Sequence, residues 1–564
     1  MSDRTPKRIL TRRAFLQAGA ASAGVFLLAA CSAPAAPAAT TVPAAKATEA
    51  PKPAATTAPA AAATSAPVAT AAPAATQAPK PAGPKRGGTF TLARTQGLTD
   101  FNPFNLASPG TWAVERPLYS TLAYYDLNLK AVPDLAESWQ IAPDGKSVTV
   151  KLRQGAKFHS GKEFTSEDVK FSCQFASTDP SVFMITLFKI IESVDTPDKY
   201  TAKINFKQLV PAPMDILDQL WMIDKDSVKD FASKPNGTGP YKLDKYVPND
   251  RSELVPHKDY FIKNKQYVDR YVAAQIPDTA SLAINVESGA IDCMWRCSVL
   301  DAARLKPQAD KYVTSMGAPG QGMYDIALNV KWGPFQNKKV RQAIAWATDR
   351  ERFCRTAMKG LVEPTCLMWP SHTWAYFKDM EKSVWFDLDK ARALLKEGGF
   401  EKGFDVEILT STSRVYGFKE LAEILQADLK QIGINAKIVD VETAVYNTRM
   451  NKGDMQIMIH NYGRSNRDPG TMVTAAKAWY VDKEGGWSHY ESADYEKIRA
   501  ELQSTTDLEK RKVTARKIQE MMLDESFTIL VAPQPTAWVW RTYVKDMRFD
   551  LENSPYMEDL WLDK

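Results

Sequence analysis

Two arginines in one short polar segment are the side chains best suited to binding a charged small molecule. Arg464 and Arg467 stand in the segment Tyr462-Gly-Arg-Ser-Asn-Arg-Asp-Pro469. A guanidinium group presents several N–H donors in one plane, which matches the geometry of carboxylate and phosphate groups. The segment therefore favours an acidic or hydroxyl-rich ligand. The alternative is that both arginines are solvated or pair with Asp468, and that Asp468-Pro469 forms only a structural turn.

The sequence contains no complete match to the common catalytic motifs. The chain has no G-x-S-x-G elbow and no H-E-x-x-H helix, and its five histidines are isolated from one another. Gly155 to Lys162 is similar to a phosphate-binding loop, but the glycine spacing is one residue too long and Glu163 replaces the hydroxyl residue that would hold magnesium. These observations predict no enzyme, no cofactor and no metal site, although a triad built from distant residues would leave no sequence motif.

The cysteines divide into one near the start and five in the body. Leu28-Ala-Ala-Cys31 matches a bacterial lipobox, in which the Cys31 thiol is acylated and the chain is cleaved just before it. The alternative is an ordinary secretory signal with an incidental Cys31. Cys293 and Cys297 are separated by three residues, and they form a disulfide or half of a metal site unless they are incidental.

The first 88 residues predict an export signal followed by a linker. A basic stretch precedes an apolar run, Ala18 to Ala30, which is too short to span about 30 Å of hydrocarbon. Thr11-Arg-Arg-Ala-Phe-Leu-Gln17 matches the twin-arginine export motif. Residues 32–86 are rich in Ala, Pro and Thr and contain no Leu, Ile, Met or aromatic residue, so we expect an extended spacer.

The charge of the chain is concentrated in that leading segment. The 564 residues carry a formal net charge of +6, of which residues 1–30 and 31–88 each contribute +4. Residues 89–564 are left with −2. The basic balance of the whole chain therefore gives no support to a nucleic-acid partner.

The body alternates between the periods of strands and helices, which predicts an α/β fold. A strand at 405–409, a helix at 418–432 and a strand at 436–441 imply parallel pairing through a crossover helix. Capping boxes at Thr165–Asp168 and Thr506–Glu509 predict two helix starts, and Gly398-Gly399 predicts a helix end. Further strands are expected at 87–93, 147–152, 200–206 and 526–531.

Several segments in the body, taken together, resemble the extracellular solute-binding proteins of family 5, which serve peptide- and nickel-type ABC importers. The matching segments cover about 88–564 in family order. They are Tyr119-Ser-Thr-Leu122, Pro133-Asp-Leu-Ala-Glu-Ser-Trp139, Asp144 to His159, Phe164 to Ser172, Gly237-Thr-Gly-Pro-Tyr241, Asn329, Pro334-Phe335, Val340-Arg-Gln-Ala-Ile-Ala-Trp-Ala347 and Asp389 to Gly399.

The resemblance implies a two-lobed α/β fold of the periplasmic-binding-protein type, in the large class that carries an extra inserted domain. Ligand would be enclosed between the lobes, with hinges near 323–330 and 530–538. The expected divisions are 1–30 signal peptide, 31–87 lipidated cysteine and linker, 88–125 with 231–325 and 533–564 lobe one, 126–230 inserted domain, and 326–532 lobe two.

The resemblance also implies that the segment after Tyr462 lines the cleft. Peptide binders of the family carry an Asp where this chain has Ser465, which argues against recognition of a free peptide N-terminus. Asn102 would contact ligand from lobe one or form a simple turn, and aromatic residues beside glycine or polar residues are expected to line the cleft. The predicted site is Asn102, Tyr462, Arg464, Ser465, Arg467, Asp468 and Trp487.

The resulting functional prediction is a solute receptor for an ABC importer, held by lipid on Cys31 at the outer face of the membrane, or in the periplasm of a two-membrane cell. Its partners would be a peptide, opine, sugar or organic acid and the permease and ATPase subunits, and the receptor itself would be a monomer. The alternatives are a secreted lipoprotein hydrolase and a binding module without a transport partner.

Overall fold

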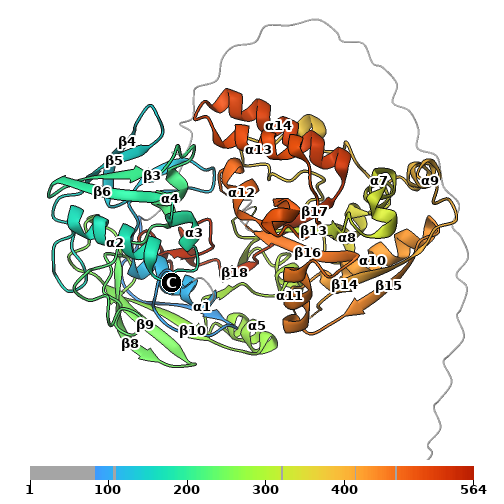
Figure 1. The fold of residues 1–564 in the computed structure, drawn as a ribbon. Helices are drawn as coiled ribbons and strands as arrows, with labels where there is room; N and C mark the ends of the chain where they lie inside the picture. Colours follow the sequence, from blue (N-terminus) through green and yellow to red (C-terminus); the bar gives the residue numbers. More distant parts are fainter. Residues whose placement is uncertain (1–82, 106–108, 319, 321, 413, 464–466) are drawn as a thin grey trace, which may run out of the picture. The chain divides into compact units, whose positions relative to one another are not determined.

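A computed structural model describes residues 83–105, 109–318, 320, 322–412, 414–463 and 467–564. The predicted signal peptide, Cys31 and almost all of the linker lie outside the described residues. The chain divides into a unit of residues 1–78 and a unit of residues 79–564, and the elements below belong to the second (Figure 1). No helix in the described ranges is both long and apolar enough to cross a membrane.

A seven-stranded sheet forms the first lobe, in the order β12-β18-β11-β1-β10-β9-β8. Its centre, β1, is parallel to both of its neighbours, whereas the other pairs are antiparallel. β18 comes from the C-terminal part of the chain and closes the sheet between β11 and β12. The strands are β1 Thr89–Arg94, β8 Tyr241–Val247, β9 Arg251–Pro256, β10 Arg270–Gln275, β11 Cys293–Trp295, β12 Tyr312–Ser315 and β18 Trp538–Arg541, with helices α1 Pro109–Leu118, α5 Thr279–Ser288 and α6 Val299–Leu305.

An antiparallel sheet of four strands, β4-β5-β7-β6, is inserted between β1 and β8 of this lobe. Helix α2 (Ser166–Thr178) begins at the predicted capping box, where Asp168 accepts a 3.0 Å hydrogen bond from the Thr165 backbone N–H. The inserted domain and the first lobe share one apolar core. The other elements are β2 Ala123–Tyr125, β3 Ala131–Pro133, β4 Ala136–Ile141, β5 Ser147–Leu152, β6 Ile191–Asp198, β7 Thr201–Phe206, α3 Ile185–Phe188 and α4 Met214–Gln219.

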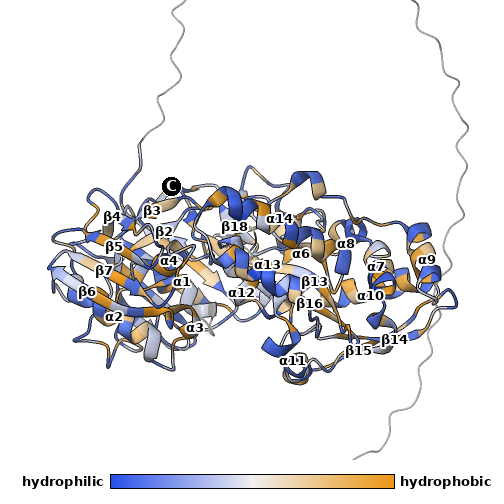
Figure 2. Ribbon diagram, turned by 45° about the horizontal axis from the view of Figure 1, so that its top comes forward, coloured by the Kyte–Doolittle hydropathy of each residue, from blue (hydrophilic) through white to orange (hydrophobic). Residues whose placement is uncertain are grey.

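A five-stranded sheet, β15-β14-β16-β13-β17, forms the second lobe and has a core of its own. The predicted parallel crossover is confirmed, since β14 (Asp405–Thr410) pairs in parallel with β15 (Asn435–Asp440) and α10 (Phe418–Gln431) connects them. α10 carries both hydrophobic and hydrophilic residues, as expected of a helix with one face on a core (Figure 2). The remaining strands are β13 Gly322–Leu328, β16 Ile457–Gly463 and β17 Thr528–Gln534.

Eight α-helices are described in the second lobe: α7 Lys338–Trp346, α8 Arg350–Thr356, α9 Leu388–Glu397, α10, α11 Thr443–Lys452, α12 Pro469–Ala475, α13 Ala493–Gln503 and α14 Leu508–Glu525. Short 3-10 turns occur at η1 Gly333–Gln336, η2 Lys378–Met380, η3 Lys477–Trp479 and η4 Asp482–Glu484. The C-terminal segment of the first lobe adds the two-residue strands β19 Val544–Lys545, β20 Arg548–Phe549, β21 Pro555–Tyr556 and β22 Trp561–Leu562.

Some predicted boundaries differ from the structure by a few residues. Helix α14 is capped by Asp507 rather than Thr506, because the Asp507 carboxylate accepts from the N–H groups of Glu509 and Lys510 at 3.0 and 3.1 Å. The last predicted strand starts later, at Thr528. The expected lobe boundaries at 325/326 and 532/533 stay predictions, and these positions fall inside β13 and β17.

Candidate ligand-binding cleft

A cavity of about 640 Å³ lies where the two lobes face each other. Its size is within the range of small-molecule pockets. First-lobe residues, second-lobe residues and the connection between β17 and β18 all contribute to its wall. The lining residues are Gln96, Trp112, Phe183, Thr279, Arg296, Cys297, Ser298, Gly322, Arg414, Val415, Tyr416, Asn461, Gly463, Gln534, Pro535, Thr536, Ala537 and Glu552.

Arg296 is the central charged group of the first-lobe wall. It directly follows β11, in a left-handed backbone conformation with φ of 51°, which is unusual for a residue other than glycine and typical of functional sites. Its guanidinium carbon lies 4.9 Å from the ring centre of Trp112 and 5.6 Å from that of Trp295. Burial lowers the pKa of Arg296 to about 10, with an opposing effect from Glu552, so the side chain remains cationic at neutral pH.

This cation forms no ion pair with a carboxylate of the described residues. None of the ion pairs formed within the described ranges involves Arg296, and its buried Nη1 lacks a hydrogen-bond acceptor there. The indole N–H of Trp112 also lacks one in the same part of the chain. Buried donors without acceptors are costly, and a ligand that carries an anionic oxygen would satisfy them.

The second-lobe wall supplies another arginine, in the loop after β14. Arg414 donates a 3.1 Å hydrogen bond to the Asn461 side chain of β16. Asn461 in turn donates a 2.7 Å bond to the side chain of Gln534, at the end of β17. Tyr416 completes this wall and is anchored through its hydroxyl to the Ala357 carbonyl at 2.9 Å. A neutral side chain thus holds Arg414 in place, and no acidic residue in the described part of the chain forms an ion pair with it.

Glu552 is the one carboxylate among the described residues that line the cavity, and its charge is already engaged. It accepts a 2.8 Å hydrogen bond from Arg467 of the second lobe. Arg467 also forms an ion pair with Asp218 of α4 in the inserted domain. Because Arg467 is only 3% exposed, this bridge between the lobes is shielded from solvent screening.

Arg116 of α1 extends this charged cluster within the first lobe. Its guanidinium contacts Asp550 at 3.0 Å and Asp218 at 3.4 Å, and lies 3.9 Å from Asp134. Burial by itself lowers the pKa of Arg116, but Tyr556 and the three aspartates outweigh it and raise the pKa well above the usual value. We call Arg116, Asp134, Asp218, Arg467, Asp550 and Glu552 the charged network.

None of the five predicted site residues that are described lines the cavity. Asn102 is buried and forms a turn, since its side-chain oxygen accepts a 2.9 Å bond from the Phe104 backbone. Tyr462 is buried on β16 and donates a 2.9 Å bond to the Met368 carbonyl. Arg467 belongs to the charged network. Arg464 and Ser465 lie outside the described residues.

The other two predicted residues also have partners within the protein. Asp468 caps helix α12, pairs with Arg511 and accepts a 3.1 Å hydrogen bond from the Trp374 indole. Trp487 packs on His460 with ring centres 4.1 Å apart. A direct contact between these residues and a ligand stays a prediction.

The sequence pattern does not single out Trp112, Arg296 or Arg414. Arg296 stands between Cys293 and Cys297, whose thiols are the stronger signal in that segment. The five body cysteines are buried and free. Within the described ranges, no group of three or more metal-ligating side chains is close enough to hold a metal ion.

Comparisons with known proteins show which family and which solved structures this chain is similar to. A family model, described as bacterial extracellular solute-binding proteins, family 5 Middle, matches residues 130–482. The dipeptide-binding protein of Escherichia coli (strain K12) is 27% identical over 467 residues, or 77% of this chain and 86% of that protein. Heme-binding protein A of Haemophilus influenzae is 26% identical over 483 residues, or 79% and 87%. The solved structure of HbpA2 from Haemophilus parasuis has a TM-score of 0.75 and 22% identity, and covers 85% of this chain and 100% of that one.

Proposed function

We propose, for a chain that belongs to the bacterial extracellular solute-binding proteins of family 5, that its cleft recognises a solute through an anionic group. As a member of that family the chain is an extracytoplasmic solute-binding protein of the kind that serves ABC importers. The observation that carries the proposal is Arg296, a cationic side chain that lines the cleft, stacks on two tryptophans and has no acidic partner in the described ranges.

Binding would couple to closure because the two arginines that form no ion pair among the described residues come from different lobes. Arg296 belongs to the first lobe and Arg414 to the second, so a carboxylate between them contacts both only when the lobes are together. A ligand shifts an equilibrium by its difference in affinity for the two states, and these contacts favour the closed state. The importer would then read that state, and no covalent bond need be made or broken.

The ligand class follows from the same contacts. A planar carboxylate suits the guanidinium fork of Arg296, and the flanking tryptophan rings suit an apolar or unsaturated body. Small peptides, opines and organic acids carry such a group, and neutral sugars do not. The acidic ligand expected from Arg464 and Arg467 is thus retained as a proposal, now supported by Arg296 and Arg414.

The proposal is tested by calorimetric titration of the purified protein with dipeptides, opines and dicarboxylates, each paired with its amide. We expect binding by at least one acid and none by its amide. Arg296→Gln should weaken that binding about tenfold to a hundredfold, which is the loss of charge-assisted hydrogen bonds. Arg304→Gln, at an exposed position on α6, is the matched control and should bind as the wild type does. Equal binding by Arg296→Gln would refute the proposal.

The location of the receptor is proposed from the leading segment. We infer that the twin-arginine motif exports the chain and that acylated Cys31 anchors a monomer to the membrane. Two or more acyl chains give stable anchoring, whereas one is marginal. Mass spectrometry of the mature N-terminus should find a lipidated Cys31, and Cys31→Ser should release the protein into the soluble fraction. A soluble wild-type protein that retains residues 1–30 would contradict this.

A further inference from the structure

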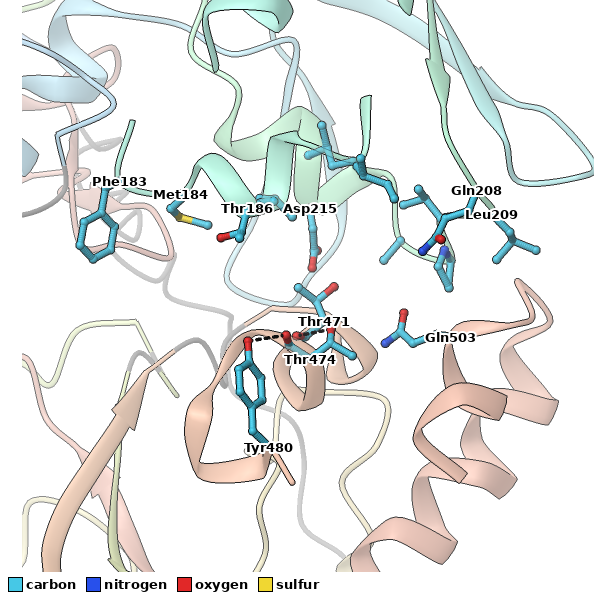
Figure 3. A pocket seen from close by; sticks show the side chains of 16 residues that line it. Phe183, Met184, Thr186, Gln208, Leu209, Asp215, Thr471, Thr474, Tyr480 and Gln503 are labelled. Atoms are coloured by element: carbon cyan, nitrogen blue, oxygen red, sulfur yellow. Dashed lines mark hydrogen bonds between the residues drawn. The ribbon is translucent and has the colours of Figure 1, made fainter. Parts of the chain in front are cut away.

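A second cavity, of about 350 Å³, opens between the inserted domain and the second lobe (Figure 3). One wall is mainly apolar and comes from α3, the loop after β7 and the start of α4. The opposite wall comes from α12 and its neighbours and offers Thr471, Thr474, Tyr480 and Gln503. A volume of this size holds roughly ten water-sized groups. It is therefore large enough for a substantial part of a small molecule.

Asp215 of α4 points into this gap, toward Thr471 and Thr474 (Figure 3). The residue is 1% exposed, and neither carboxyl oxygen has a well-formed hydrogen bond within the described ranges. The hydroxyls of Thr471 and Tyr125 are its polar neighbours. Both of these neighbours are neutral hydroxyls, so a charged donor supplied to this buried carboxyl group would be favourable.

The charges around Asp215 do not fill that need, because each is engaged elsewhere. Asp468 is paired with Arg511, and Arg467 with Asp218 and Glu552. Of Asp215, Asp218 and Asp468, only Asp215 remains without a cationic partner in the described part of the chain. Its surroundings favour a ligand group that is both a hydrogen-bond donor and positively charged.

Phe183 connects the second cavity to the cleft that contains Arg296. Its ring lines both cavities, and it is 60% exposed although it is a large apolar side chain. An exposed aromatic ring at the passage between two cavities offers a surface over which an apolar chain can lie. The two cavities can therefore be occupied by one elongated molecule.

We propose that the second cavity is an accessory subsite for the far end of the ligand, which is an elongated zwitterion with an anionic end at Arg296, an apolar middle over Phe183 and an amine end near Asp215. This inference rests on the proposed function, since it takes the anionic end from it. It adds a contact between the inserted domain and the ligand, and through Thr471 and Gln503 it adds a second link between the lobes.

The probes for the test are straight-chain ω-amino acids of four, six, eight and ten carbons, with the alkanoate of each length as the uncharged-end control. Dissociation constants are measured by calorimetry on the full-length protein. We expect affinity to rise by at least about tenfold once the chain is long enough to reach the second cavity. At that length the ω-amino acid should bind at least about tenfold more tightly than its alkanoate.

Two variants address the second cavity and leave Arg296 intact. Asp215→Asn keeps the shape of the side chain and should abolish the preference for the amine. Thr186→Trp, at an exposed position that lines the cavity, should fill it and remove the gain with length. Thr448→Trp, exposed on α11 and in the lining of neither cavity, is the control for a surface tryptophan and should bind like the wild type.

The outcomes separate the two proposals. Affinity that is independent of length, or a gain that survives in both Asp215→Asn and Thr186→Trp, overturns the accessory subsite while leaving the anionic site intact. Loss of short-probe binding in Arg296→Gln supports the anionic site in either case. If Arg296→Gln binds the short probes as the wild type does, the proposed function itself fails. Absence of binding at every length also overturns the accessory subsite.

Discussion

Arg116 and Arg296 are both arginines of the first lobe, the first buried and the second partly buried, yet their surroundings are opposite. Arg116 has three aspartates within 4 Å and lies 4.7 Å from the ring centre of Trp221. Arg296 has tryptophan rings on which to stack but no acidic partner in the described ranges. The presence or absence of acidic partners around such a cation therefore distinguishes a structural role from a binding role. A charge already neutralised holds the protein together, and one left over is available to a ligand.

The largest effect is expected at Arg116. Arg116→Gln would leave Asp134, Asp218 and Asp550 buried around a neutral side chain, and breaking a buried charge cluster typically costs about 3–5 kcal/mol. We expect the free energy of unfolding to fall by that amount in chemical denaturation.

The control is Arg516→Gln, which removes an exposed ion pair with Asp379. Exposed pairs are worth about 0–1 kcal/mol. Comparable losses in the two variants would mean that burial of the Arg116 network contributes nothing, and the distinction between the two kinds of arginine would break down.

The next effect is expected at Arg467, whose partners lie across the cleft. Arg467→Gln leaves each lobe its own core but removes the bridge to Asp218 and Glu552. We expect closure to become less favourable by about 2 kcal/mol, which is roughly thirtyfold in ligand affinity. Small-angle scattering of the unliganded variant should show a larger radius of gyration than the wild type. An unchanged radius together with unchanged affinity would contradict a bridging role.

Much of the fold can be predicted from local sequence patterns. The capping box at Thr165 and the glycine stop after α9 act within a few residues, and both are where the sequence places them. The crossover from β14 through α10 to β15 follows from hydrophobic periodicity. The ends of β13 and β17 are harder to predict, because the pairing of β13 with β16 and with β17, rather than local sequence, fixes their lengths.

The candidate site was less predictable for a physical reason. Arg467 looks like a ligand-binding residue in sequence because its partners, Asp218 and Glu552, are distant along the chain. Arg296 gives no signal in the sequence because its proposed role depends on the absence of an acidic partner among the described residues. A missing carboxylate is a property of three-dimensional packing and leaves no mark on neighbouring residues. Arg414 of the second lobe is equally hard to predict, because its contact with Asn461 joins residues that are distant in the sequence.

A third, smaller effect is expected at Asp215, a buried acidic residue that has no cationic partner in the described ranges. Burial, aided by Asp468, raises the pKa of Asp215 to about 7, from an ordinary value near 4. The folded state therefore binds more protons than the unfolded state between about pH 4 and 7, so the contribution of Asp215 to stability is lost as the pH rises through that range. One such group changes the slope by up to about 1.4 kcal/mol per pH unit.

The slope is isolated by comparing the wild type with Asp215→Asn. Asp134, whose pKa is also raised to about 7 by burial, acts in the same direction, and His159, whose pKa burial lowers to about 3, acts in the opposite one. Because both are present in the two proteins, the difference between their denaturation curves reports Asp215. Parallel pH profiles from 4 to 7 would show that its carboxyl group is not held protonated.

The smallest effect on stability is expected at Arg296. The contrast between Arg296→Gln and Arg116→Gln tests most directly whether the two arginines differ in role. Arg296→Gln loses stacking worth about 0.5–2 kcal/mol on the tryptophans, but it also removes an unpaired charge whose burial is unfavourable. We expect the free energy of unfolding of the ligand-free protein to stay within about 1 kcal/mol of the wild type. A saturating acid should stabilise the wild type and leave the variant unchanged, since only a ligand that binds the folded state raises its stability. If Arg296→Gln were instead as damaging as Arg116→Gln, the missing carboxylate would not mark a binding residue, and both arginines would have to be regarded as structural.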